Sequence, residues 1–233
     1  MNIGIYLVSN YPKKSIFLEA VEICNNLDVD FLEIGIPFSD PIADGEVLEK
    51  ASFEMLEKYS TLDFLESLFE VKRLFKKKLY AMTYSNIPYS LKDEFNKYSS
   101  VLDGIILADL PVREAIEFEK KLGCNIIKFA TPESRSSDLD LAIKSTKDFI
   151  YFISKRGITG GNFAIESQTV QKINYCRKQA KVYLGFGIRS ADDVAKASQI
   201  SDGVIIGTQA AIELQKGIQG FERFIKNIKS INL

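Results

Sequence analysis

The sequence predicts an α/β fold, a (β/α)8 TIM barrel that forms a single domain over residues 1–233. Short apolar runs recur at intervals of roughly 20 to 30 residues and alternate with segments of helical period. Eight strand–helix pairs in a chain of 233 residues match the count and the length of such a barrel. Because no linker or low-complexity tract divides the chain, we expect one domain. An open doubly wound sheet is the alternative.

The apolar runs predict the strands. Each run is almost continuously apolar, which is typical of a parallel strand that is buried on both faces. The expected strands are residues 3–8, 31–36, 78–84, 103–109, 125–130, 149–154, 181–186 and 203–207.

Apolar residues at helical spacing predict the helices between the strands. Thr61 and Ser190 are the expected N-caps of two of them. Pro111 marks the start of a third helix, because proline suits the first turn of a helix. A further short helix is expected in "GTQAAIEL", which begins at Gly207. The other expected helices are residues 15–27, 61–75, 112–122, 190–200 and 220–231.

The composition argues against several classes of protein. With 30 basic and 31 acidic residues, the net charge of −1 provides no field for nucleic acid or an anionic membrane. No run approaches the roughly 18 apolar residues that a membrane span needs. The N-terminus reads as a strand rather than a signal peptide. Three scattered cysteines predict thiols in a reducing cytoplasm.

The chain contains no histidine. This excludes a Ser-His-Asp triad, a histidine general base and a histidine metal site, and we expect no metal. Acid–base chemistry must therefore fall to Asp, Glu, Lys, Tyr or Cys. In a barrel of this kind the active site lies at the carboxyl ends of the strands, so polar residues there are the candidates.

Glu33 is a carboxylate inside the second apolar run. Residues 31, 33 and 35 share one face of that strand, so Glu33 is expected to point into the barrel near its mouth. Gly35, one step higher, is expected to leave space above it. An unpaired carboxyl group there has a raised pKa and can carry protons near neutral pH. The alternative is a structural acid bonded to the backbone or to a lysine.

Asp44 stands before Gly45, where the loop after the second strand ends and a helical segment begins. An aspartate in this place is often an N-cap, and spacing alone leaves its role open.

Three glycine clusters follow strands: Gly160–Gly161, Gly185–Gly187 and Gly207–Thr208. Barrels often bind phosphate with the loops after strands 7 and 8 and a short extra helix, whose N-terminal amides accept the anion. The clusters therefore predict a phosphate site. Simple tight turns are the alternative.

Two further side chains have open roles. Lys128 is a possible Schiff-base lysine, but an ion-paired or snorkelling lysine is the stronger interpretation. Tyr151 belongs either to the core or to the ligand site, and its hydroxyl needs a partner if it is buried.

At this point the motifs resemble a known family. "LEIGIPFSDPIADG" is similar to the signature loop of the tryptophan synthase alpha subunit. The resemblance covers nearly the whole chain and includes "YP" after strand 1, "ADLP" after strand 4, "SKRGITG" after strand 6, "GFGI" after strand 7 and "IIGT" at strand 8.

The resemblance implies a retro-aldol cleavage of indole-3-glycerol phosphate to indole and glyceraldehyde 3-phosphate. It implies that Glu33 is the catalytic acid–base, that Asp44 binds the indole N–H, and that Tyr151 is an active-site tyrosine. By the same resemblance, the substrate-binding residues are Tyr84, Thr159, Gly160, Phe186, Gly187, Gly207 and Thr208.

The resemblance also implies a partner, the tryptophan synthase beta subunit, in an α2β2 heterotetramer. Asp40, in the signature loop, and Pro111 would face that subunit. No cofactor is expected in this chain, because the pyridoxal phosphate would belong to the partner. The alternatives are a stand-alone lyase that releases indole, another phosphate-binding barrel enzyme, and a degenerate subunit that only activates its partner.

The sequence departs from the family pattern at several points. The first strand begins the chain, so the barrel is expected to lack the extra N-terminal helix that commonly covers its floor. The residue departures are Asn10 for glycine, Glu46 for proline, Lys155–Arg156 in the lid segment and Thr208 for serine.

Overall fold

The computed structural model describes residues 1–42, 44–153, 165–185 and 187–231. Within these residues, eight parallel strands form one sheet in the order β4-β3-β2-β1-β8-β7-β6-β5. The strands are β1 (Asn2–Val8), β2 (Phe31–Gly35), β3 (Lys78–Thr83), β4 (Gly104–Leu107), β5 (Lys128–Ala130), β6 (Phe149–Ile153), β7 (Lys181–Gly185) and β8 (Gly203–Ile206).

The two edge strands of this sheet approach each other and almost close it into a barrel. A parallel bridge joins Ile105 of β4 to Ile126, just before β5. The Ile105 amide donates to the Asn125 carbonyl at 2.8 Å, and the Ile127 amide donates to the Ile105 carbonyl at 2.9 Å. The predicted (β/α)8 TIM barrel is therefore confirmed, and the doubly wound alternative is wrong.

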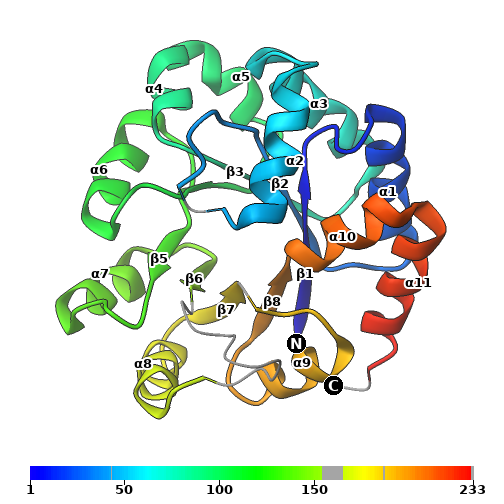
Figure 1. The fold of residues 1–233 in the computed structure, drawn as a ribbon. Coiled ribbons are helices and arrows are strands. Elements are labelled where there is room, and N and C mark those ends of the chain that lie inside the picture. Colours follow the sequence, from blue (N-terminus) through cyan, green and yellow to red (C-terminus); the bar gives the residue numbers. More distant parts are fainter. Residues whose placement is uncertain (43, 154–164, 186, 232–233) are drawn as a thin grey trace.

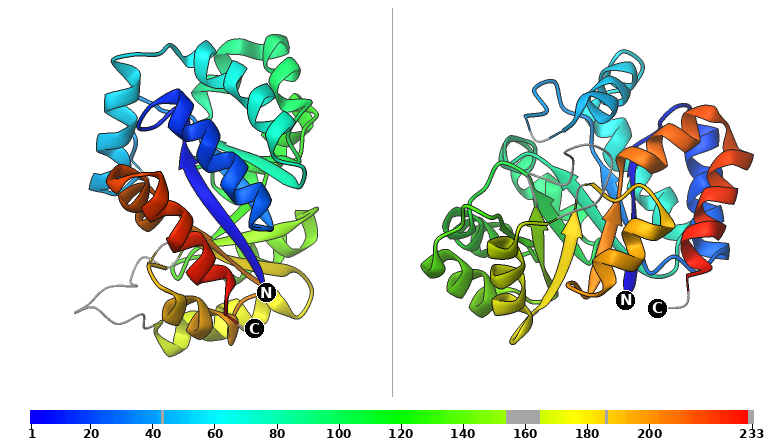
Figure 2. Two further views of the ribbon diagram at one scale, coloured as in Figure 1. Left: turned by 90° about the vertical axis from the view of Figure 1, so that its right-hand side faces the viewer. Right: turned by 60° about the horizontal axis from the view of Figure 1, so that its bottom comes forward.

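Helices surround the strands (Figure 1). Helices α1 and α11 lie side by side on the flank that covers β1 (Figure 2). Within the described ranges, no helix combines the length and the apolar character that crossing a bilayer requires. The helices are α1 (Lys14–Asn26), α2 (Glu46–Leu56), α3 (Thr61–Leu74), α4 (Asn86–Leu91), α5 (Phe95–Ser99), α6 (Val112–Leu122), α7 (Ser136–Ser145), α8 (Ser167–Arg177), α9 (Ala191–Ser198), α10 (Thr208–Lys216) and α11 (Ile218–Lys229), with a 3-10 turn at Lys92–Glu94.

The helix starts test the predicted N-caps. Ser190 caps α9, as expected, and forms a capping box with Asp193. The prediction that Thr61 caps α3 is wrong, because Ser60 holds that position and Thr61 is the first helical residue. The Ser60 amide donates to the Asp63 carboxylate at 2.8 Å, and the Asp63 amide donates back to Ser60 Oγ at 3.3 Å. Asp63, three residues after Ser60, completes this capping box, and this is why Ser60 rather than Thr61 is the N-cap.

Large rings fill the lower part of the barrel. The rings of Phe149 and Tyr183 stack with centroids 4.2 Å apart, and Phe31 stacks on Tyr183 at 5.4 Å. Tyr80 meets Phe31 edge-on at 5.6 Å. Their polar tips are bonded at the floor, where the Tyr80 hydroxyl donates to Asp148 and the Asn2 amide donates to the Tyr183 hydroxyl. The floor is thus an aromatic layer with a polar rim.

Glycines on neighbouring strands make room for these rings. A methyl group built on Gly4 would lie 2.1 to 2.7 Å from three ring atoms of Phe31, and one on Gly203 would lie 2.6 Å from Tyr183. Both approaches are closer than side-chain carbons tolerate. The interior therefore depends on a ring from one strand lying over a glycine of the next.

We expect Gly4→Ala to lower the free energy of unfolding by about 2 kcal/mol or more, because the Phe31 ring is held by its neighbours and cannot retreat. Urea denaturation followed by circular dichroism measures this change. Gly220→Ala in α11 is the matched control, since its methyl group would meet only ordinary contacts from 3.5 Å outward. The control should be stabilised slightly, and equal behaviour of the two variants would contradict the prediction.

Candidate active site

Glu33 lies at the centre of β2 and points into the barrel, as its parity predicts. Its Cα is in register with Tyr6 of β1 on one side and with Tyr80 of β3 on the other. The residue is 0% exposed, and neither carboxyl oxygen has a hydrogen-bond partner among the described residues. The alternative of a bonded structural acid is therefore not what the structure shows. Burial, with repulsion from Asp44, raises the pKa of Glu33 to about 8.

The space expected above Glu33 is occupied, so that prediction is wrong. A methyl group built on Gly35 would lie 2.0 Å from the hydroxyl oxygen of Tyr6, whose ring leans over this glycine from β1. Gly35 thus accommodates a tyrosine of the neighbouring strand rather than leaving a void. Tyr6 was not among the sequence-predicted site residues.

Asp44 is not the cap of the helix that follows it. Gly45 is the N-cap of α2 and makes no side-chain capping bond, so the carboxylate of Asp44 has no capping role. Burial, with repulsion from Glu49, raises the pKa of Asp44 to about 6. Glu46 is the first helical residue, where its negative charge favours the positive end of the helix dipole. That position accounts for the departure at Glu46.

Tyr151 lies on β6, across the barrel from β2. A methyl group built on Gly185 would lie 2.4 Å from the Tyr151 hydroxyl oxygen, so this ring also lies over a glycine of the next strand. Burial raises the pKa of Tyr151 well above its ordinary value, and Glu33 and then Asp44 add to the rise. Tyr84 follows β3, and its ring centroid lies 4.9 Å from that of Phe38 in the signature loop.

The predicted phosphate residues are only partly described. Gly207 is the N-cap of α10 and Thr208 is its first residue, so the predicted short helix after β8 is confirmed. Gly187 has a φ of 85°, which lies in the left-handed region that glycine adopts readily. Thr159, Gly160, Phe186 and the lid residues Lys155–Arg156 lie outside the described residues.

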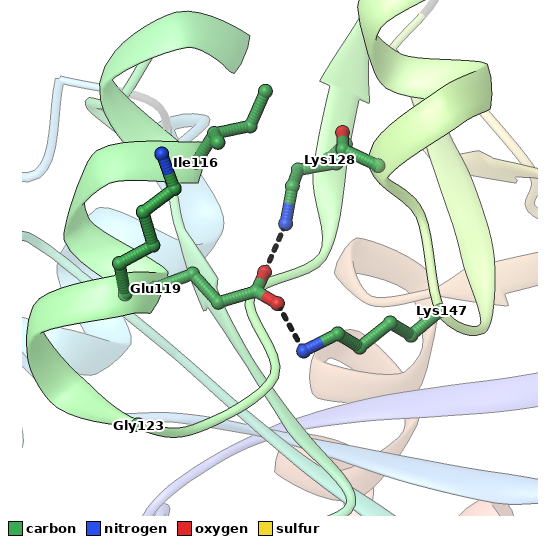
Figure 3. Close-up of a pocket in the computed structure, with 7 residues that line it drawn as sticks. Ile116, Glu119, Gly123, Lys128 and Lys147 are labelled. Atoms are coloured by element: carbon green, nitrogen blue, oxygen red, sulfur yellow. Dashed lines mark hydrogen bonds and ion pairs between the residues drawn. The ribbon is translucent and has the colours of Figure 1, made fainter.

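Lys128 faces away from the carboxylates and is ion-paired, which confirms the stronger interpretation and not the Schiff-base one. Its side chain is buried and forms an ion pair with Glu119 of α6. Lys147 reaches the other oxygen of the same carboxylate at 2.5 Å (Figure 3). The pocket drawn there lies between α6, β5 and the segment that joins α7 to β6, on the outer wall of the barrel.

The structure also describes Asn10, which departs from the family pattern, and the two predicted partner-contact residues, Asp40 and Pro111. Asn10 has a φ of 63° and accepts a hydrogen bond from Ser67 Oγ at 3.0 Å. Asparagine tolerates the left-handed conformation better than most residues, which explains how it replaces glycine. Asp40, in the loop before α2, and Pro111, the N-cap of α6, are both exposed.

The carboxyl groups of Glu33 and Asp44 differ in protonation state at neutral pH. With a pKa of about 8, Glu33 keeps its proton at pH 7, whereas Asp44, with a pKa of about 6, has mostly lost its own. Titratable groups whose environments separate their pKa values are the usual sign of acid–base work. The site can donate a proton from Glu33 and stabilise positive charge with Asp44.

The model of the family described as "Tryptophan synthase alpha chain" matches residues 3–232 of this sequence. The chain belongs to the tryptophan synthase alpha chain family. It is therefore a lyase with the alpha-subunit role in tryptophan biosynthesis, and the resemblance that the signature loop predicted is confirmed.

Individual relatives agree with this membership. The tryptophan synthase alpha chain of Caldicellulosiruptor saccharolyticus is 31% identical over 97% of this chain and 91% of its own length. That of Methanocaldococcus jannaschii is 33% identical over 87% and 75%. A chain from the solved tryptophan synthase α2β2 complex of Pyrococcus furiosus has the same fold, with a TM-score of 0.87, 24% identity and coverage of 99% and 98%.

Tyr6 is a further side chain beside the candidate site that sequence reasoning missed. Its pKa is raised well above the ordinary value by burial and then by repulsion from Asp44, Glu33, Tyr151 and Tyr84, the four described side chains predicted for the indole end. The available signal was parity, because residues 4, 6 and 8 of β1 face the barrel interior together.

The raised pKa of Glu33 makes stability depend on pH. Between pH 4.5 and about 8 the unfolded chain has lost this proton while the folded chain keeps it, so the free energy of unfolding falls as pH rises. We expect Glu33→Gln to gain stability relative to wild type across this window, by up to about 1.4 kcal/mol per pH unit. Urea denaturation at pH 5, 6, 7 and 8 measures the difference.

The exposed Glu57→Gln variant is the control for this measurement, since its difference from wild type should stay constant with pH. Parallel curves for Glu33→Gln and wild type would show that Glu33 is ionised in the folded chain.

Proposed function

We propose that this chain cleaves indole-3-glycerol phosphate to indole and glyceraldehyde 3-phosphate, with Glu33 and Asp44 as its two principal groups. The bond between indole C3 and the glycerol carbon breaks, indole C3 gains a proton, and the hydroxyl of the glycerol carbon loses one as that carbon becomes the aldehyde. The observation that carries the proposal is the buried Glu33 carboxyl group, which has no partner among the described residues and a pKa near 8.

Glu33 is suited to both proton transfers. In its protonated form it delivers a proton to indole C3, and as the resulting carboxylate it takes the proton from the glycerol hydroxyl. One group can do both in turn, because its pKa near 8 makes the two forms similar in free energy close to neutral pH. The glutamate returns to its starting state after one turnover.

Asp44 is proposed to bind the indole N–H. Protonation at C3 places positive charge on the ring nitrogen, and a neighbouring carboxylate stabilises that charge as it develops. Asp44 is partly buried and mostly ionised at pH 7, which supports this role. Tyr151 is proposed to contact the substrate beside Glu33, and Tyr84 to line the same end of the site.

The phosphate is proposed to bind at the N-terminus of α10. The first amides of a helix have no acceptor within it and carry the positive end of the helix dipole, so they suit an anion. Gly207 and Thr208 begin this helix. Gly187 is proposed to complete the described part of the phosphate site, while Thr159, Gly160 and Phe186 are proposed from the family resemblance.

We expect Glu33→Gln to reduce the cleavage rate by roughly two or more orders of magnitude, because it removes a positioned acid–base group. Steady-state release of indole from indole-3-glycerol phosphate measures this rate. Asp44→Asn should also be severely impaired. Glu46→Gln, an exposed acid two residues from Asp44, is the control and should retain activity. A Glu33→Gln variant near the wild-type rate would refute the assignment.

We also propose that the chain assembles with a tryptophan synthase beta subunit, which would hold the pyridoxal phosphate. The Pyrococcus furiosus relative of known structure belongs to an α2β2 complex with mutual activation. The loop after β2 exposes Asp40 and the apolar Ile42 at the carboxyl end of the barrel, which supports a contact surface there. Pro111, exposed after β4, is proposed to lie on the same surface.

We expect Asp40→Ala to weaken binding to the cognate beta subunit by about tenfold, since it removes a rim charge from the proposed interface. Isothermal titration calorimetry measures the affinity. Asp28→Asn is the matched control, because Asp28 precedes β2 and lies at the opposite end of the barrel. No binding by wild type would favour a stand-alone lyase.

A further inference from the structure

Tyr6 is a neighbour of Glu33 on the interior face of the barrel. The two Cα atoms are directly in register on β1 and β2. The Tyr6 side chain is buried, with the start of its ring against Gly207 and its hydroxyl over Gly35. Gly35 is two residues from Glu33 on the same face of β2, so the Cα atoms of these two residues are about 6.6 Å apart along the strand. The hydroxyl therefore lies nearer the carboxyl end of β2 than the Glu33 backbone does.

The groups that face Tyr6 come from four other parts of the chain. They are Glu33 on β2, Asp44 before α2, Tyr84 after β3 and Tyr151 on β6. Two of these groups, Asp44 and Tyr151, also interact electrostatically with Glu33, as Tyr6 itself does. Burial first, and then repulsion from Asp44 and Glu33, raises the pKa of Tyr6, so its hydroxyl keeps its proton and is a donor at neutral pH.

Glu33 needs such a donor in one of its two forms. When protonated, the carboxyl group is neutral and tolerates burial. When ionised, a buried carboxylate without hydrogen bonds is strongly destabilised, and neither oxygen has a partner among the described residues. The proposed reaction passes through this ionised form in every turnover.

The other tyrosine in register with Glu33 is already engaged. Tyr80 of β3 donates its hydroxyl to Asp148 at the barrel floor. Lys128 is paired with Glu119 on the outer wall. The Tyr6 hydroxyl, by contrast, lies over Gly35, on the side of Glu33 nearer the barrel mouth. Of the two cross-strand neighbours, only Tyr6 has a hydroxyl available at the carboxyl end of the strands.

We infer that Tyr6 is a positioning residue of the active site, whose hydroxyl donates a hydrogen bond to the ionised form of Glu33 and holds it for proton transfer. The reach follows from the placement above, because rotation about the glutamate side-chain bonds moves its carboxylate toward Gly35. This inference rests on the proposed function for its consequence in catalysis, although the hydrogen bond itself can be tested without substrate.

The test compares wild type with Tyr6→Phe, which keeps the ring over Gly35 and removes only the hydroxyl. With 13C-labelled glutamate carboxyl groups, NMR follows the titration of Glu33, assigned by its loss in Glu33→Gln. We expect the Glu33 titration to move up by about one pH unit or more in Tyr6→Phe, because the ionised form loses a charge-assisted hydrogen bond. Tyr183→Phe at the barrel floor is the matched control and should leave the titration unchanged.

The kinetic readout separates positioning from substrate contact. We expect kcat of Tyr6→Phe to fall by about tenfold at pH 7 with KM little changed, and its pH–rate limb to shift in the direction of the NMR titration. A Glu33 titration identical in Tyr6→Phe and wild type would overturn the inference, as would a change in KM alone. An inactive wild type would instead refute the proposed function, while the NMR titration would still decide the hydrogen bond.

Discussion

The interior of this barrel depends on aromatic rings that lie over glycines of the neighbouring strand. Phe31 lies over Gly4, Tyr151 over Gly185 and Tyr6 over Gly35, in each case too closely for any side-chain carbon at the glycine. The pattern extends from the floor to the mouth of the barrel. The same ring-over-glycine packing thus stabilises the barrel and shapes the candidate site, because the rings at the mouth lie beside the two carboxyl groups proposed for catalysis.

Burial in this interior is what suits Glu33 to its proposed role. A carboxyl group surrounded by rings and apolar side chains retains its proton to about pH 8, whereas Asp44, at the edge of the same space, titrates at about pH 6. No lysine or arginine among the described residues reaches either carboxylate, since Lys128 is directed outward to Glu119. Among the described residues, the difference between the two pKa values therefore comes first from the depth of burial and then from repulsion between carboxylates.

Most of the fold could be predicted from the sequence, because the periods of strands and helices are local and strongly expressed. Parity likewise directed Glu33 inward. What could not be predicted depends on contacts between strands. The space over Gly35 is filled by a side chain from β1, and nothing near Gly35 in the sequence indicates that. The cap of α3 depends on whether Ser60 or Thr61 meets Asp63, and Asp44 looked like a cap because only the backbone shows that Gly45 holds that position. Tyr6 was overlooked because a tyrosine in an apolar strand resembles ordinary core.

The junction between β4 and β5 has a consequence for the site as a whole. Only the residues around Ile105 and Ile126 join these strands, whereas the other neighbouring strands pair along several residues. The barrel therefore consists of two four-stranded halves. They are joined by four paired residues between β1 and β8 and by a single bridge between β4 and Ile126, just before β5. Glu33, Asp44 and Tyr6 belong to the first half and Tyr151 to the second. Motion between β4 and β5 would change the distance between these residues. A molecule that contacts both halves would therefore fix the proposed catalytic groups relative to one another.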